Sequence, residues 1–413
     1  MLNRKITPKL FVQVPTTGET VTESAVIVSA ARSPMGKGKP GGVLSEVHAV
    51  DLLSSVIAGV IEKTGIDPGS VDDVLIGCVS QVGEQSGTPG RQAWLAAGFP
   101  EHVPSVTIER KCGSGQQALD FAVQGVMAGA YEVAIAGGLE SMSRIPMGSN
   151  RLDMDPQGPT VRGRYPNLSS QGVAAELVAH KWNISRKALD EYSAQSQQRA
   201  ESAADKGLFD AEIIPITTVH GSAKSDESIR RGTTENKLAT LEPAFSTEQS
   251  RQRWPEIQWK VTAGNSSQIT DGAAALLVMS EKSAAKYGLR PRARIVATAV
   301  VGDDPILMLT GPIPATRRVL AKSGLTIEQM DAIEVNEAFA SVPLAWLSEF
   351  PVDVAKLNPL GGAIALGHPL GASGARIATT LLHHLEETGG RYGLQTMCEA
   401  GGMANAMIIE RLD

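Results

Sequence analysis

One order of structural signals occurs twice along this 413-residue chain, and this internal repeat constrains the fold more than any other feature. In each copy a helical pattern is followed by a glycine, a short linker and an Asp-led strand pattern. A second helix, starting on a pair of small residues, and a further strand come later. Four elements in the same order indicate an internal duplication. The first copy lies at 53–79, 112–130 and 134–141, and the second at 314–339, 371–390 and 395–406.

Strand and helix patterns also alternate through the first part of the chain. Short β-rich runs occur at 25–30, 72–80 and 131–141, with helical patterns at 49–65 and 116–130 between them. Only 4% of residues are aromatic, so we expect a core built from Ala, Val, Ile and Leu. The alternation predicts an α/β fold with a mixed or parallel sheet.

A polar region rich in Arg, Ser and Gln separates the two copies. Its strongest helical signal covers 185–207, where Ser185 can cap the start and Gly207 the end. We interpret the region as an inserted loop domain that covers one face of the core and shapes a substrate site. The predicted division is an N-terminal extension at 1–24, a first half at 25–141 and 261–290, the insertion at 142–260, and a second half at 291–413.

The N-terminal extension carries Arg4, Lys5 and Lys9 but no apolar segment of the kind that secretory signals need. We interpret it as a disordered or locally docked extension. A cleaved organellar targeting peptide is the alternative, and the cytoplasm is the default location.

Charge and cysteine content exclude several classes of protein. The net charge is −6, without a basic block, which argues against a nucleic-acid partner. No uncharged apolar run reaches the ~18 residues of a membrane helix. The three cysteines stand far apart without a CxxC pair, so neither a zinc site nor a disulfide framework is predicted.

Three short stretches carry residues suited to chemistry. In KCGSG, Cys112 stands just before a helix, whose N–H groups favour a thiolate; a merely buried cysteine is an equal alternative. His368 lies in the glycine-rich loop of NPLGGAIALGHPLGASGAR, as a general base or a structural hydrogen-bond partner. Cys398 precedes a glycine pair in CEAGGMA, and Asn336 and Glu337 end a predicted strand in NEAFA.

Taken together, these residues suit acyl transfer. The first cysteine could form a covalent acyl thioester after the histidine takes its proton. The second could move a proton to or from carbon. Two pockets lined with hydrogen-bond donors would then stabilise the two carbonyl oxygens that become negative.

Several long motifs, in the right order, resemble those of the thiolase family. The resemblance runs from Ala25 to the end of the chain. The matching stretches are AVIVSAARSPMGKGKPG, KCGSGQQAL, AGGLESMSRIPM, VTAGNSSQITDGAAA, LTGPIPATRRVL, VNEAFA, NPLGGAIALGHPLGASGAR and CEAGGMANA.

The resemblance implies the thiolase fold: two βαβαβαββ halves in a five-layered α-β-α-β-α core, plus a loop domain. It also implies acyl transfer between coenzyme A thioesters. In the degradative direction, a 3-ketoacyl-CoA and CoA yield acetyl-CoA and a shortened acyl-CoA. In the reverse direction, two acyl-CoAs undergo Claisen condensation.

By the same resemblance, Cys112 matches the acylated nucleophile, and His368 the histidine that activates it and donates to the thioester oxygen. Cys398 matches the acid/base that protonates the acetyl-CoA enolate or removes the α-proton. Asn336 matches the asparagine that holds a water in the first oxyanion hole.

The remaining predicted site residues bind rather than react. The backbone N–H groups of Cys112 and Ala400 match the second oxyanion hole. Ser267 in AGNSS matches a serine near the CoA pantetheine, and Arg230 in DESIRRG an arginine near the CoA nucleotide. No metal or cofactor is implied, since coenzyme A is a substrate, and family members are usually homodimers or homotetramers.

Two departures from the family pattern bear on function. The family usually reads Cys-x-Gly-Gly-Gly, whereas Ala400 here keeps the N–H donor but adds a methyl that restricts the backbone. Short-chain biosynthetic members carry His-Met where this chain has Ser170-Gln171, which favours a degradative thiolase for longer or bulkier chains. The alternatives are an acetoacetyl-CoA-forming enzyme, a decarboxylating ketoacyl synthase, or a non-catalytic CoA- or lipid-binding homologue.

Overall fold

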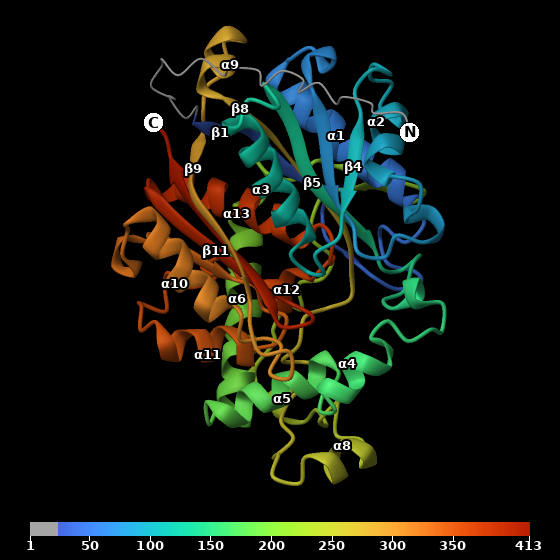
Figure 1. Ribbon diagram of the computed structural model, residues 1–413, viewed down its shortest axis with the longest axis vertical. Helices are drawn as coiled ribbons and strands as arrows, with labels where there is room; N and C mark the ends of the chain where they lie inside the picture. Colours follow the sequence, from blue (N-terminus) through green and yellow to red (C-terminus); the bar gives the residue numbers. More distant parts are fainter. Residues whose placement is uncertain (1–23) are drawn as a thin grey trace, which may run out of the picture.

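Two sheets of like topology meet edge to edge in the computed structural model, which describes residues 24–413 (Figure 1). Their order is β4-β3-β5-β8-β1 in the first half and β9-β12-β11-β10 in the second. They join through the antiparallel pairs Val26–Arg294 and Ile27–Ala293. The predicted extension at 1–24 lies, except for Ser24, outside the described residues.

The first half has the order βαβαβαββ. It begins with β1 and closes with β8, which pairs antiparallel with both β1 and β5. The short strand β2 (Gly36–Lys37) also pairs with β8. The eight elements are β1 (Ala25–Arg32), α1 (Ala49–Thr64), β3 (Asp73–Gly77), α2 (Pro89–Ala96), β4 (Ser105–Ile108), α3 (Ser114–Met127), β5 (Val133–Ser141) and β8 (Thr270–Ser280).

The second half repeats this order, which confirms the predicted fold class. Its third strand is reduced to one parallel bridge between Ile333 and Leu357. The short helices η1 (Pro68–Ser70) and η4 (Ile327–Gln329) occupy the same place in each copy. The elements are β9 (Ala293–Gly302), α10 (Pro312–Ser323), β10 (Ala332–Val335), α11 (Ser341–Glu349), α12 (Ala363–Leu366), α13 (Ser373–Thr388), β11 (Tyr392–Glu399) and β12 (Met403–Arg411).

One detail of the predicted repeat was wrong. The stretch 395–406, aligned with the single strand 134–141, covers the end of β11, a turn and the start of β12. In the second half these two strands are joined directly at 400–402. Their counterparts in the first half, β5 and β8, are separated by the whole insertion.

Five layers follow from how the helices pack. Helix α1 packs on β1 and β8, α3 and α13 lie between the two sheets, and α10 packs on β9 and β12. The central layer is built mainly from Ala, Leu, Val and Ile, as the low aromatic content of the chain predicts. The helices α3 and α13 approach closely because Gly115 on α3 faces the backbone just before α13. A Cβ on Gly115 would lie 2.6 Å from the Gly371 carbonyl oxygen.

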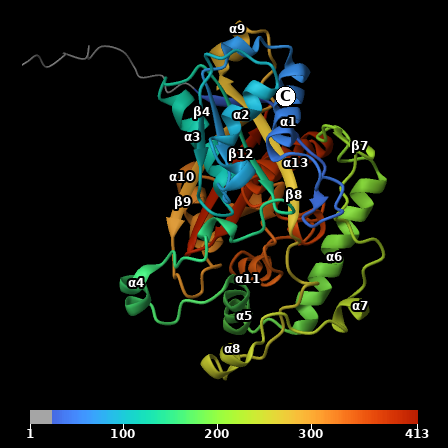
Figure 2. The same cartoon turned by 90° about the vertical axis from the view of Figure 1, so that its right-hand side faces the viewer.

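The segment between β5 and β8 extends away from the sheets, with α4, α5 and α8 at the far end of the molecule (Figure 2). The predicted helix at 185–207 is present as α6, with Ser185 accepting from Ala188 N at 3.1 Å and Gly207 at φ 69°. The predicted domain boundaries stay a prediction. The segment's elements are α4 (Gly158–Arg164), α5 (Gln171–Lys181), α6 (Arg186–Asp205), β6 (Ile216–Thr218), β7 (Gly221–Ala223), α7 (Glu235–Ala239) and α8 (Glu248–Arg253).

No helix within residues 24–413 is both long enough and apolar enough to cross a membrane. The shorter elements not yet given are η2 (Gly83–Gln85), η3 (Ser149–Arg151) and α9 (Glu281–Lys286).

Candidate active site

A tight turn presents Cys112 at the start of α3. Lys111 has φ 49°, in the left-handed region that non-glycine residues rarely adopt. Ser114 holds the turn closed: its hydroxyl donates to the Lys111 carbonyl at 2.6 Å and accepts from Arg110 N at 2.8 Å. Cys112 is buried against a small apolar cluster that includes Met142.

The protonation state of Cys112 differs from the prediction. We expected the helix start to favour the thiolate, but burial and the nearby Glu399 carboxyl raise the pKa of Cys112 to about 12. The backbone N–H groups of Cys112 and Ala400 act in the opposite sense, without overcoming burial. Cys112 therefore rests as a thiol, and a base must take its proton when substrate binds.

His368 is held by its backbone and by one ring nitrogen. Its N–H donates to Thr270 Oγ1 at 3.0 Å, and Nδ1 lies 2.6 Å from Ser373 Oγ. Because the Ser373 hydroxyl donates to the Pro369 carbonyl at 2.8 Å, it accepts from Nδ1–H. This assignment makes Nε2 the nitrogen that carries the lone pair and can accept a hydrogen bond or a proton. Burial and Arg376 lower the pKa of His368 to about 3, so the ring is neutral near pH 7.

Asn336 contacts His368 and the strand that carries the second cysteine. Its side-chain Nδ2 lies 3.4 Å from His368 Nε2, and its backbone N–H donates to the Thr396 carbonyl at 3.0 Å. Thr396 stands two residues before Cys398 on β11. The end of β10 is thereby fixed beside the strand that carries Cys398.

The adjacent Glu337 anchors this strand end to the insertion. Its buried carboxylate accepts from Tyr192 OH at 2.8 Å, Ser196 Oγ at 2.7 Å, Asn358 Nδ2 at 3.0 Å and Ile364 N at 3.1 Å. These partners come from α6 and from the loop leading to His368. Glu337 therefore ties two separate segments, α6 and this loop, to the end of β10.

Cys398 lies close to Cys112. It is 1% exposed, and burial followed by the charge of Cys112 raises the pKa of Cys398 well above its usual value. The turn after it uses glycines at 401 and 402, with φ 95° and 76°. Ala400 is not among the described residues with positive φ, so its methyl imposes no left-handed strain.

The structure brings some predicted site residues together and leaves others apart. Cys112 is near Cys398, and Asn336 is near His368, but no hydrogen bond within residues 24–413 joins Cys112 to His368. The two predicted CoA-binding residues meet through Gln268: Arg230 Nε donates to its side chain at 3.2 Å, and Ser267 precedes it. The Gln268 carbonyl also accepts from His368 N at 3.1 Å.

Ser373 and Gln268 are site residues that the sequence analysis missed. Ser373 contacts His368 and Pro369 within an irregular loop, and Gln268 contacts Arg230 and His368, which are distant in the chain. The local signals are weak: Ser373 stands five residues after His368 in GHPLGASG, and Gln268 directly follows Ser267 in VTAGNSSQITDGAAA, both within stretches already singled out.

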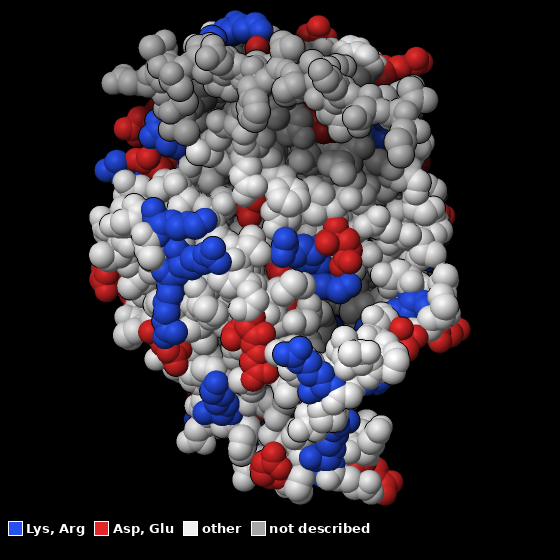
Figure 3. All heavy atoms as spheres, viewed as in Figure 1, with Lys and Arg blue, Asp and Glu red and all other residues white. Residues whose placement is uncertain are grey.

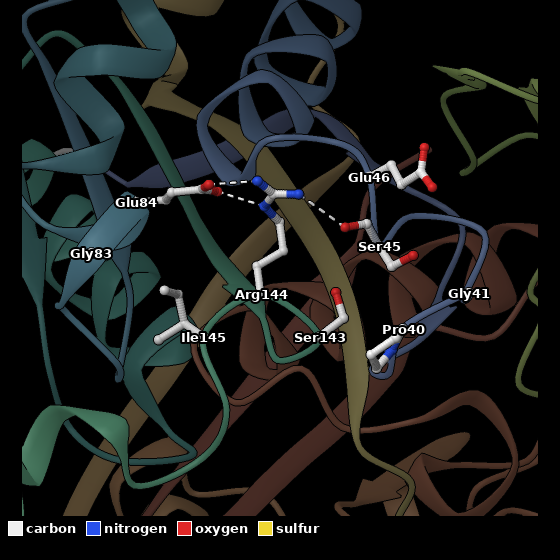
Figure 4. A pocket seen from close by; sticks show the side chains of 9 residues that line it. All are labelled: Pro40, Gly41, Ser45, Glu46, Gly83, Glu84, Ser143, Arg144 and Ile145. Carbon is white, nitrogen blue, oxygen red and sulfur yellow. Dashed lines mark hydrogen bonds and ion pairs between the residues drawn. The ribbon is translucent and has the colours of Figure 1, made fainter.

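A cavity of about 410 Å³ lies beside the segment that follows β5 (Figure 4). Arg144 crosses it, donating from Nε to Glu84 Oε2 at 2.6 Å and from NH1 to the Ser45 carbonyl at 3.0 Å. Glu84 balances the charge of Arg144, and Glu46 adds a second acid to the lining. None of the predicted site residues lines this cavity.

Basic side chains do not form one patch on the face shown in Figure 3. They lie in separate groups, with acidic side chains between them. This face therefore offers local anion sites rather than one extended track for a polyanion. Within residues 24–413 no group of three or more His, Cys, Asp and Glu is arranged to hold a metal ion.

The two duplicated halves, with their two buried cysteines and a neutral histidine, have the architecture that the resemblance to the thiolases implies. Comparison with known families agrees. The thiolase N-terminal domain matches residues 25–282, and the thiolase C-terminal domain matches 289–411. The chain belongs to the thiolase family, which confirms the prediction from the sequence.

Individual relatives are similar over almost their whole length. The steroid 3-ketoacyl-CoA thiolase FadA6 of Mycobacterium tuberculosis is 48% identical, over 97% of this chain and 98% of the relative. The beta-ketoadipyl-CoA thiolase of Pseudomonas aeruginosa is 41% identical, over 95% and 100%. The crystal structure of the Bacillus anthracis acetyl-CoA acetyltransferase has a TM-score of 0.84 and 37% identity, over 95% and 100%.

Replacing Ser373 with alanine is expected to lower kcat by about tenfold with little change in KM, because Nδ1 loses the partner that fixes the tautomer of His368. The kinetics of CoA-dependent cleavage measure this. Ser348→Ala on α11 is the matched control, since Ser348 also donates to the carbonyl four residues earlier but touches no histidine. An equal change in both variants would contradict the role given to Ser373.

Proposed function

We propose that this protein is a degradative thiolase, which cleaves 3-ketoacyl-CoA with CoA to acetyl-CoA and a shortened acyl-CoA, and which also runs in reverse. The observation that carries the proposal is a pair of buried cysteines, Cys112 close to Cys398, in a chain that also holds His368 beside Asn336. The names of the relatives support the same reaction class.

In the first half-reaction, the proton of the Cys112 thiol moves to His368 Nε2 as the sulfur attacks the 3-keto carbon. The bond between C2 and C3 then breaks, and its electron pair forms the enolate of acetyl-CoA. Cys398 gives its thiol proton to C2. Because burial disfavours an imidazolium, the proton is expected to reach His368 only as the carbon–sulfur bond forms.

In the second half-reaction, a new CoA thiol enters and gives its proton to the Cys398 thiolate. The CoA sulfur attacks the acyl carbon on Cys112, and the shortened acyl-CoA leaves. Cys112 departs as a thiolate and takes back the proton held by His368. Both cysteines are again thiols, which matches the raised pKa of each.

Two sets of donors would stabilise the negative oxygens. The backbone N–H groups of Cys112 and Ala400 point to the region of the nucleophile sulfur, and we assign them to the acyl-enzyme carbonyl. His368, with Asn336 and a water, would serve the thioester oxygen of the acetyl unit.

Coenzyme A would bind along the insertion. Arg230 is exposed and stands beside Gln268, so its guanidinium can reach a phosphate of the nucleotide. Ser267 is half-buried beside the loop that carries His368 and would meet the pantetheine. The predicted loop domain at 142–260 would thus cover the substrate.

Ser170 and Gln171 support a preference for longer or bulkier acyl chains. Ser170 caps α5, accepting from Val173 N at 3.4 Å, where biosynthetic members place histidine. An acetoacetyl-CoA-forming enzyme is the second candidate, supported by the 37% identity to an acetyl-CoA acetyltransferase. A homodimer or homotetramer and a cytoplasmic location stay predictions.

Cleavage of 3-ketoacyl-CoAs of increasing chain length tests the proposal. We expect higher kcat/KM for long or bulky substrates than for acetoacetyl-CoA. A strong preference for acetoacetyl-CoA would favour the second candidate. No turnover of any chain length would favour a non-catalytic CoA- or lipid-binding homologue.

A further inference from the structure

A glutamate lies buried directly behind the two cysteines. Glu399 follows Cys398 at the end of β11, is 0% exposed, and neither carboxyl oxygen has a hydrogen-bond partner among the described residues. Burying a charged carboxyl without a partner costs free energy. An apolar residue is therefore expected at a buried strand end like this one. The predicted chemistry gives it no role.

The carboxyl of Glu399 lies against the nucleophile turn. A Cβ placed on Gly113, the residue after Cys112, would overlap the Glu399 carboxyl and lie 2.7 Å from Asn405 Nδ2. The same Asn405 Nδ2 donates to the Gly113 carbonyl at 3.1 Å. Glu399 on β11 and Asn405 on β12 thus contact the turn at Gly113 from the second half of the molecule.

Few charged groups face this carboxyl. Arg110 and Glu109 approach from the segment before α3, and Asp120 from α3 itself, besides the two cysteines. No ion pair between Arg110 and Glu399 is present in residues 24–413, and Arg110 Nε is itself buried without a partner. The carboxyls of Glu399 and Asp120 therefore have no hydrogen-bonded cation among the described residues.

Burial raises the pKa of Glu399 to about 8, with Arg110 opposing the shift. Asp120 has its pKa raised well above its usual value for the same reason. Glu399 is thus mostly neutral below pH 8 and negative above it. Once negative, it raises the pKa of both Cys112 and Cys398 through its charge.

We propose that Glu399 is a positioning residue for both cysteines: its buried carboxyl packs between the Gly113 turn and the Cys398 turn, and its negative charge, when present, adds to burial in keeping both cysteines as thiols. The reactivity of Cys112 is thereby limited at alkaline pH. The catalytic consequence rests on the proposed function, whereas the effect on the thiol itself does not.

Alkylation by iodoacetamide tests the proposal without turnover. Each cysteine is followed by peptide mass spectrometry from pH 6 to 10 in wild type and Glu399→Gln, which keeps the shape of the side chain but cannot ionise. We expect Cys112 in the variant to react about three- to tenfold faster at pH 9, with a smaller difference at pH 7. Cys78, whose pKa Glu399 does not affect, is the internal reference.

Glu334→Gln is the matched control. Glu334 is a buried acid on β10 whose pKa burial raises to about 8, yet its charge acts on neither cysteine. The proposal is supported if Cys112 is alkylated at the wild-type rate in Glu334→Gln and at a faster rate in Glu399→Gln. Identical Cys112 profiles in wild type and Glu399→Gln would overturn it.

A second variant guards against misfolding. Glu399→Met removes the charge with an apolar side chain of similar length, which avoids the cost of burying an unpaired carboxylate. It should also speed Cys112 alkylation at pH 9, and a wild-type rate in a folded Glu399→Met would overturn the proposal. Thiolysis is then measured over the same pH range. If Glu399→Gln alters alkylation but neither wild type nor any variant shows thiolysis, the proposed function is contradicted. The inference about Glu399 is still supported in that case.

Discussion

Replacing Cys112 with alanine is expected to eliminate the acyl-enzyme and to lower kcat for thiolysis by at least about 10⁴-fold, because no other described thiol is placed to attack the 3-keto carbon. Intact-mass spectrometry after addition of an acyl-CoA measures the first effect, as loss of the acyl adduct. Steady-state cleavage of a 3-ketoacyl-CoA measures the second.

Cys78→Ala is the control for this substitution. Cys78 is also a buried free cysteine, just after β3, but it has no place in the proposed reaction. We expect it to keep the acyl adduct and most of the activity. An acyl adduct that persists in Cys112→Ala, or that disappears in Cys78→Ala, would show that the nucleophile has been misassigned.

Replacing Cys398 with alanine should separate the two kinds of chemistry. Carbon–carbon cleavage should fall by about 10²- to 10⁴-fold, because C2 of the enolate loses its proton donor. Acylation of Cys112 by a simple acyl-CoA involves no carbon–carbon bond and should persist in part. The raised pKa of Cys398 suits a group that gives up its proton only to a strong base such as an enolate.

Both half-reactions should be followed in the same preparation. Adduct formation on Cys112 reports acylation, and release of acetyl-CoA from a 3-ketoacyl-CoA reports cleavage. A Cys398→Ala variant that loses both to the same extent would contradict this division of labour. It would indicate that Cys398 instead supports the nucleophile, which its closeness to Cys112 also allows.

Much of this site could be predicted from short motifs. A cysteine before a helix, a histidine in a glycine-rich loop and a second cysteine before glycines are all local patterns. Ser373 could not be assigned in this way, because its role depends on the direction in which its hydroxyl donates. Glu399 could not either, since its neighbours Gly113 and Asp120 are about 280 residues away in the chain.

The sequence by itself determined the duplicated α/β fold and the family, and it predicts the reacting residues. The fold follows from periodicity and capping residues, and the family and the predicted residues from motifs, all of which are properties of neighbouring positions. Only the tertiary structure decided the protonation states. Burial in the junction of the two halves outweighs the helix start at Cys112 and the usual basicity of His368, and desolvation depends on what distant segments pack there.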